Sequence, residues 1–155
     1  MMKLSFRRAV NSFRYRVVRP FTAARDWASK MDFRKSYPKL VKRLDREHGH
    51  DAAMRMAVGG QFEAIGILER ETLIHHGLRG GGYLVDVGCG SGRLAKPLAE
   101  YLEGKYLGID VVPELVEYAR RLVPRGDWRF EVAKGLTIPE EDGRADMVCF
   151  FSVLT

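Results

Sequence analysis

The residues with the clearest chemical potential are one carboxylate and three glycines within seven positions of each other: Asp86, Gly88, Gly90 and Gly92. Asp86 lies within a largely apolar run over 83–87, and the three glycines follow that run. A helical pattern begins directly after them, at Arg93. A strand, a glycine loop and a helix in succession form the front half of a nucleotide-type site, because glycine lets a ligand approach the backbone closely. A second acid, Asp110, ends another apolar run 18 residues beyond Gly92.

The details of the loop indicate the class of ligand. A dinucleotide fingerprint needs a third glycine at position 93, where this chain has arginine. Asp86 would repel a pyrophosphate by about 4 kcal/mol at about 4 Å in an effective dielectric near 20. The same carboxylate would attract an ammonium or a sulfonium, so the loop favours a cationic, nucleoside-bearing ligand, of which S-adenosylmethionine is the common one.

The segment 86–92, Asp-Val-Gly-Cys-Gly-Ser-Gly, resembles motif I of the class I S-adenosylmethionine-dependent methyltransferases. Further segments follow in the family's order, at 106–110, 128–132 with Ile138-Pro139 behind it, and 146–152. The resemblance runs from about residue 60 to the last residue. It implies that Asp110 accepts the ribose hydroxyls of the cofactor and that Val111 contacts the adenine face.

The resemblance implies an α/β fold, a Rossmann-like three-layer sandwich with a mostly parallel sheet. Complete members have seven strands in the order 3-2-1-4-5-7-6, whereas we expect four here, near 83–87, 105–109, 128–132 and 146–151. We therefore expect a C-terminally truncated methyltransferase whose fourth strand is an apolar, unpaired edge.

Ten residues are expected to contact the cofactor: Asp86, Gly88, Cys89, Gly90, Gly92, Asp110, Val111, Lys134, Gly135 and Phe151. Lys134 departs from the family, which commonly has an acid there to receive the adenine amino group, since lysine has donors only. Backbone carbonyls near Lys134 and Gly135 are the expected substitute. No catalytic residue is identified, and no metal is expected because His48, His50 and Asp51 lack a distant fourth partner.

Each of these residues also has a plainer interpretation. The glycines could form only a tight turn, Asp86 could cap the following helix, and Asp110 could be an ordinary helix-entry acid before Pro113, a residue that suits the first turn of a helix. Together, at these spacings, the plainer interpretations require several coincidences.

The charge is distributed unevenly along the chain. Residues 1–50 hold 14 Lys and Arg against 4 acids, and residues 1–25 contain no acid. An apolar stripe at helical spacing, formed by Phe6, Val10, Phe13 and Val17, predicts an amphipathic helix there. It could lie on an anionic membrane surface, bind nucleic acid or pack on the domain, and an Arg-rich start also resembles a transit peptide.

We expect a basic helical extension and connector over 1–58 and a methyltransferase domain over 59–155. Tyr37-Pro38 is expected to interrupt the helical pattern, and a helix starting near Phe62 is expected to stop near Gly77. The two cysteines are expected to be reduced, which suits a cytoplasmic protein, and no apolar run approaches the ~20 residues of a membrane helix.

The expected function is methyl transfer to an unidentified small-molecule or glycan-type acceptor. Nucleic-acid bases are disfavoured as acceptors, because Phe-Phe-Ser-Val stands at 150–153 in place of the Asn/Asp-Pro-Pro-Tyr tetrad of amino-methylating enzymes. The alternative is a non-catalytic, methyltransferase-like binding module. The sequence does not decide the oligomeric state.

Overall fold

The computed structural model describes residues 33–134 and 137–151. The expected basic helix at 1–25 therefore lies outside the described residues, as do Gly135 and the last four positions. Every described element after Phe33 belongs to one compact unit, Arg34–Leu154. No helix in the described part of the chain is long and apolar enough to cross a membrane.

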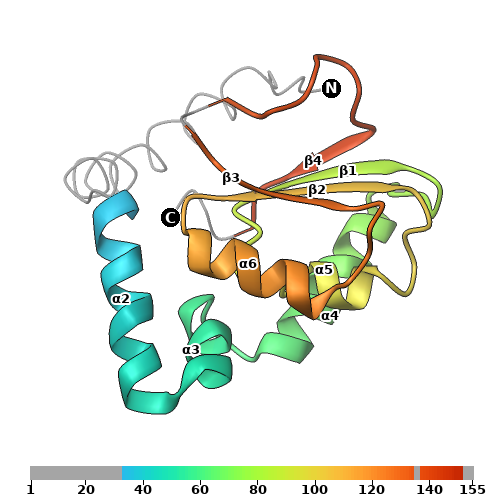
Figure 1. Cartoon of the computed structure of the whole chain (residues 1–155). Helices are drawn as coiled ribbons and strands as arrows, with labels where there is room; N and C mark the ends of the chain where they lie inside the picture. Colours follow the sequence, from blue (N-terminus) through green and yellow to red (C-terminus); the bar gives the residue numbers. More distant parts are fainter. Residues whose placement is uncertain (1–32, 135–136, 152–155) are drawn as a thin grey trace, which may run out of the picture. The chain divides into compact units, whose positions relative to one another are not determined.

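A parallel four-stranded sheet forms the centre of this unit (Figure 1). Its strands lie in the order β3-β2-β1-β4 and are β1 (Tyr83–Val87), β2 (Lys105–Asp110), β3 (Arg129–Val132) and β4 (Met147–Cys149). The helices are α2 (Phe33–His48), α3 (His50–Ala57), α4 (Phe62–His75), α5 (Ala95–Leu98) and α6 (Pro113–Leu122). The order matches the first four strands expected from the family, so the Rossmann-like α/β fold is confirmed.

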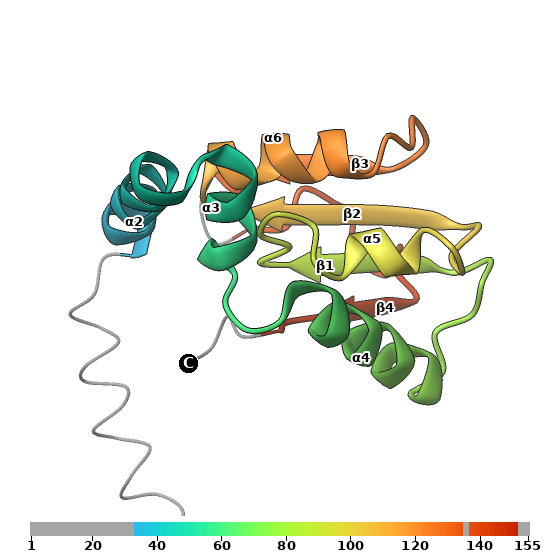
Figure 2. The ribbon, with the colours of Figure 1, turned by 90° about the horizontal axis from the view of Figure 1, so that it is seen from below.

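Burial of the strand centres explains why these segments form a sheet. All four residues over 106–109 of β2 are buried, as are the three central residues of β1. Figures 1 and 2 show α4, α5 and α6 on the same face of the sheet. The other face carries Val85, Leu107 and Ile109, which pack with Ala145 from the segment before β4. Strands that are buried on both faces have nearly continuous apolar sequences, and the central strands β1 and β2 follow this pattern.

The register of β1 and β2 determines what meets at the carboxyl edge of the sheet. Asp86 pairs with Gly108 and Val87 pairs with Ile109. The next positions along the two chains are Gly88 and Asp110, so the start of the glycine motif and the second acid emerge side by side. The expected strand at 105–109 thus extends one residue further, to Asp110.

The helices α2 and α3 pack against α6 rather than standing apart. Val41, Leu44 and Met54 share a buried cluster with Leu115 of α6. The expectation that Tyr37-Pro38 interrupts the helix is wrong, since Pro38 lies within α2. The helix begins only five residues earlier, so the proline removes a single backbone hydrogen bond close to the helix start.

At the amino edge of the sheet, two glycine segments approach each other through their backbones. The amide of Gly104 donates to the carbonyl of Gly80 at 2.9 Å, and the amide of Lys105 donates to the carbonyl of Gly82 at 3.0 Å. A Cβ atom on Gly104 would lie 2.0 Å from the Gly82 carbonyl oxygen. This contact fixes the position where β1 and β2 begin.

On the helical face, α4 approaches the chain just after the glycine motif equally closely. A Cβ atom built on Gly66 would lie 2.3 Å from the carbonyl oxygen of Arg93. The obstacle is backbone, so it cannot rotate away as a flexible side chain could. The absence of a side chain at position 66 is therefore what allows α4 to pack here.

Gly66→Ala is expected to lower the free energy of unfolding by about 1–3 kcal/mol through overpacking. Helix propensity alone predicts the opposite, a gain of about 1 kcal/mol. Urea unfolding followed by circular dichroism measures the difference. Gly126→Ala is the matched control, since a Cβ there meets nothing within 4 Å. A Gly66→Ala variant as stable as the wild type would contradict the close packing.

Candidate functional site

The glycine loop, residues 88–92, is held against the end of β2 by hydrogen bonds. The amides of Gly88 and Cys89 donate to the carbonyl of Ile109 at 2.7 and 3.0 Å. The amide of Gly90 donates to Oδ2 of Asp110 at 3.0 Å. Gly90 has φ +53°, in the left-handed region that favours glycine. The sequence-predicted loop and acid are therefore brought together.

Asp110 is half-buried at the carboxyl end of β2, and both of its oxygens accept backbone amides. Besides the Gly90 contact, its Oδ1 accepts the amide of Val112 at 2.9 Å. Burial raises the pKa of Asp110, while amide donors from Val112, Gly90 and Val111 oppose the shift. Asp110 thus accepts an amide just before α6, as expected of an acid at a helix entry, and it also accepts an amide of the glycine loop. Each carboxylate oxygen keeps capacity for a further donor.

Asp86 lies beneath the loop, with a side chain that is 2% exposed. Its Oδ2 accepts the Tyr106 hydroxyl at 2.7 Å, and its Oδ1 lies 3.6 Å from the Sγ of Cys149. Burial raises the pKa of Asp86 to about 6, and the Tyr106 hydrogen bond partly offsets the shift. The interpretation as a helix cap is wrong, because no side chain caps the following helix α5. The carboxylate is enclosed by the core rather than open to solvent.

Ser91 was not expected to be a site residue, and its environment distinguishes it. The side chain is 0% exposed, and its Oγ has no hydrogen-bond partner among the described residues. Leaving a buried hydroxyl without a partner costs about 1–3 kcal/mol. The hydroxyl is fully enclosed in this structure, so it is an unsatisfied buried group at the loop and not a contact open to a ligand. The only sign of this residue in the sequence was its place within the 86–92 motif.

The other expected contact residues lie around this edge of the sheet. Cys89 is buried in the main core, so its backbone is what faces the loop. Val111 packs partly on the cluster formed with α2 and α3, and Phe151 packs against the core. Lys134 is exposed just after β3, and the amide of the preceding Ala133 donates to the carbonyl of Asp110 at 2.8 Å.

A buried ion pair beside the loop could not be found from sequence spacing. Arg93 and Glu69 of α4 are 8% and 7% exposed. Arg93 Nε donates to Oε2 of Glu69 at 3.2 Å, and a second guanidinium nitrogen donates to Oε1. In the sequence Arg93 was notable as the residue that excludes a dinucleotide motif and as the start of the helical pattern after the loop. The two partners are 24 positions apart, beyond the reach of any local pattern.

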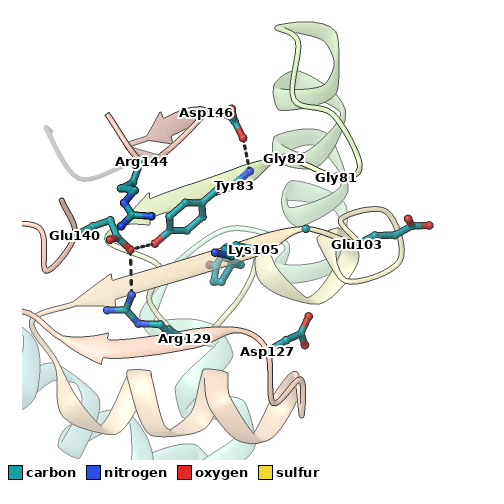
Figure 3. Close-up of a pocket in the computed structure, with 12 residues that line it drawn as sticks. Gly81, Gly82, Tyr83, Glu103, Lys105, Asp127, Arg129, Glu140, Arg144 and Asp146 are labelled. Carbon is teal, nitrogen blue, oxygen red and sulfur yellow. Dashed lines mark hydrogen bonds and ion pairs between the residues drawn. The ribbon is translucent and has the colours of Figure 1, made fainter. Parts of the chain in front are cut away.

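A hollow of about 770 Å³ lies at the opposite, amino edge of the sheet (Figure 3). Seven of its twelve lining residues are charged, and several of these are paired, as in the contact of Arg129 with Glu140 at 3.1 Å. The Tyr83 hydroxyl also donates to Glu140, and burial raises the pKa of this tyrosine to about 12. Ligands of parallel α/β sheets bind outside the carboxyl ends of the strands. We therefore place the candidate site at the glycine loop.

Comparison with known proteins agrees with this geometry. Residues 84–155 match the family model described as a methyltransferase domain. An O-methyltransferase, cnsE, of Penicillium expansum is 31% identical over 83 residues, covering 51% of this chain and 30% of that protein. The solved TehB-like SAM-dependent methyltransferase of Corynebacterium glutamicum is 25% identical, with a TM-score of 0.50 over 74% of this chain and 55% of that one. Residues 84–155 thus match a methyltransferase domain, and the chain is similar to S-adenosylmethionine-dependent methyltransferases in sequence and in fold.

The match to other methyltransferases extends to the fold. A SAM-dependent methyltransferase from Aquifex aeolicus shares the fold with a TM-score of 0.51 at 23% identity, over 73% of this chain and 55% of that chain. The chain thus spans about a third of the length of the fungal relative and about half of each solved structure. S-adenosylmethionine is the cofactor of the family.

Asp86→Asn is expected to stabilise the chain more at pH 8 than at pH 5, by about 1.5 kcal/mol. The pKa of Asp86 is about 6 when folded, above that of an unfolded aspartate. The wild type therefore loses stability as the pH rises from about 4 to about 6, because folding must then bury a charge. Urea unfolding of both proteins at the two pH values gives the difference.

Asp127→Asn is the control for this titration. Asp127 is exposed, and its hydrogen bond with Arg125 lowers its pKa, so it is fully ionised across the same range. The stability difference between this variant and the wild type should not depend on pH between pH 5 and pH 8. An Asp86→Asn difference that is equally flat would show that Asp86 does not titrate in this range.

Proposed function

We propose that this chain binds S-adenosylmethionine at the glycine loop and forms the cofactor half of a methyltransferase for a small-molecule or glycan-type acceptor. The observation that carries the proposal is the hydrogen bond from the Gly90 amide to Asp110, which holds the loop and the acid together at the carboxyl edge of the sheet.

The residues divide the binding task by their chemistry. Asp110 would accept the ribose hydroxyls with the lone pairs that Gly90 and Val112 leave free. Gly88, Gly90 and Gly92 would let the cofactor lie close to the backbone. Asp86, with its negative charge buried under the loop, would favour a cation over a phosphate.

The remaining expected residues complete the proposed contact set. Val111 and Phe151 would offer apolar surface to the adenine, and the backbone of Cys89 would line the loop. The region of Lys134 and Gly135 would supply carbonyl acceptors for the adenine amine. Lys134 itself has no acceptor, so the specificity for adenine is proposed to come from the backbone.

When bound, the cofactor supplies a methyl group that already carries a good leaving group. The protein's contribution is then alignment of the acceptor and exclusion of water, for which effective-molarity effects provide several kcal/mol. A base is needed only if the acceptor must lose a proton. The described residues at the carboxyl edge offer Asp110, which is occupied by two amides, so no base is assigned.

A small-molecule or glycan-type acceptor is proposed on the absence of the base-methylating tetrad at 150–153. The named activity of the fungal relative, O-methyl transfer, agrees with a hydroxyl acceptor. Cys89 and Cys149 are unpaired and buried, which supports the proposed cytoplasmic location. Contact of residues 1–25 with an anionic membrane surface, and the domain division at residue 58, also remain proposals.

A non-catalytic binding module is the second candidate. Lys134 in place of an acid favours it, as does the edge of β4, where the side chain of Val148 is 44% exposed. Such a module would bind a partner through the strand edge and would not depend on Asp110.

Asp110→Ala is expected to weaken the binding of S-adenosylhomocysteine about 100-fold, because two hydrogen bonds to a carboxylate are lost. Isothermal titration calorimetry of the folded wild type and variant measures the change. Asp142→Ala, which removes an exposed carboxylate from the loop before β4, should bind as the wild type does. A folded wild type that does not bind the ligand would favour the binding-module function.

A further inference from the structure

The connection between α3 and α4 lies directly on the glycine loop. This connection, residues 58–61, places the side chain of Val58 where a Cβ on Gly90 would come within 2.5 Å of its Cγ1. Gly90 is the residue whose amide reaches Asp110. The loop is therefore contacted from two sides, by β2 through Asp110 and by the connection through Val58.

The guanidinium of Arg93 holds the connection in this position. One terminal nitrogen, Nη1, donates to the carbonyls of Val58 at 2.8 Å and Gly59 at 3.1 Å. The other donors of the same guanidinium engage both carboxylate oxygens of Glu69. A planar fork with fixed donors can satisfy these four acceptors at once, which an ammonium cannot do.

The backbone of the connection needs such support. Gly59 and Gly60 have φ values of +69° and +67°, and both are exposed. Two successive glycines give the unfolded chain more conformational freedom than other residues would. No side chain caps the start of α4 at Gln61. The amide of Gly59 donates to the carbonyl of Met56 at 3.0 Å, and the carbonyl of Gly59 accepts from Arg93, which joins this backbone to the residue after the glycine loop.

We propose that Arg93 and Glu69 are positioning residues that hold the 58–61 connection against the glycine loop, where it forms a wall of the cofactor site. Neither residue needs to touch the cofactor. Arg93 acts through two backbone carbonyls, and Glu69 orients Arg93. This inference rests on the proposed function, since it assigns a role at the same site.

The position of Arg93 in the chain explains how one residue can hold the 58–61 connection and also join it to the glycine loop. It follows the glycine loop directly in the chain, and its own carbonyl is the atom that Gly66 of α4 approaches. A shift of the connection would therefore be transmitted to the loop through a single residue. Misplacement of about 1 Å can cost about 100-fold in a reaction that depends on alignment.

The test uses the full chain and S-adenosylhomocysteine as the probe. Hydrogen–deuterium exchange of the wild type, with and without ligand, is expected to show at least about ten-fold slower exchange at the amides of 59–61 on binding. A wild type that binds the ligand but leaves these amides unprotected would overturn the inference and leave the proposed function standing. A wild type that binds no ligand overturns both.

Arg93→Lys provides the second measurement. It keeps the charge beside Glu69 but not the fork, and we expect its dissociation constant for the ligand to rise about ten-fold or more. Arg70→Lys is the matched control, because Arg70 also joins α4 to the α5 region, through Pro97 and Glu100, without touching the connection. We expect that variant to bind within about two-fold of the wild type.

A merely structural role of Arg93 makes a different prediction. It would lower thermal stability in Arg93→Lys while leaving the affinity of the folded fraction unchanged, and that result would overturn the inference. If Arg93→Lys does not fold, Val58→Ala replaces it, since Val58 is half-buried and its substitution removes the contact with Gly90 while retaining the carbonyl. Unchanged affinity in that variant would count equally against the inference.

Discussion

Parallel pairing of β1 with β2 in a fixed register is the constraint on which the site depends. A shift of one residue would move Asp110 away from Gly90 and would turn each side chain of the strand to the opposite face. The buried centres of both strands prevent that shift, because Val85 and Leu107 would have to change faces. The hydrophobic core therefore sets the position of a polar contact at its edge.

Three carboxylates are used in different ways around this edge. Asp110 faces the loop and is stabilised by amide donors, whereas Asp86 is enclosed and receives a phenol hydroxyl. Glu69 is buried but paired with an arginine. Each buried acid thus has a partner suited to its charge, which is the condition for retaining it in a low-dielectric interior.

The sequence predicted the parts of the molecule that local pattern determines. An apolar run located the first strand, the order of the family's segments located the other three, and the family motif placed the glycine loop beside Asp110. The contacts of Arg93 with Glu69 and with the 58–61 connection were missed, because they join residues 24 to 35 positions apart whose spacing follows no periodicity. Pro38 was misjudged because a proline near the start of a helix costs less than one in its middle.

The backbone contact between Gly104 and Gly82 has a consequence for how such a chain can diverge. Any other amino acid at position 104 would force its Cβ into the Gly82 carbonyl, so the amino edge of the sheet accepts no change of side chain there. The carboxyl edge combines the glycine loop with side chains on separate segments, such as Val58 and Lys134, and those side chains can be altered one at a time. New ligand preferences can therefore arise at one end of the strands while the other end keeps the frame unchanged.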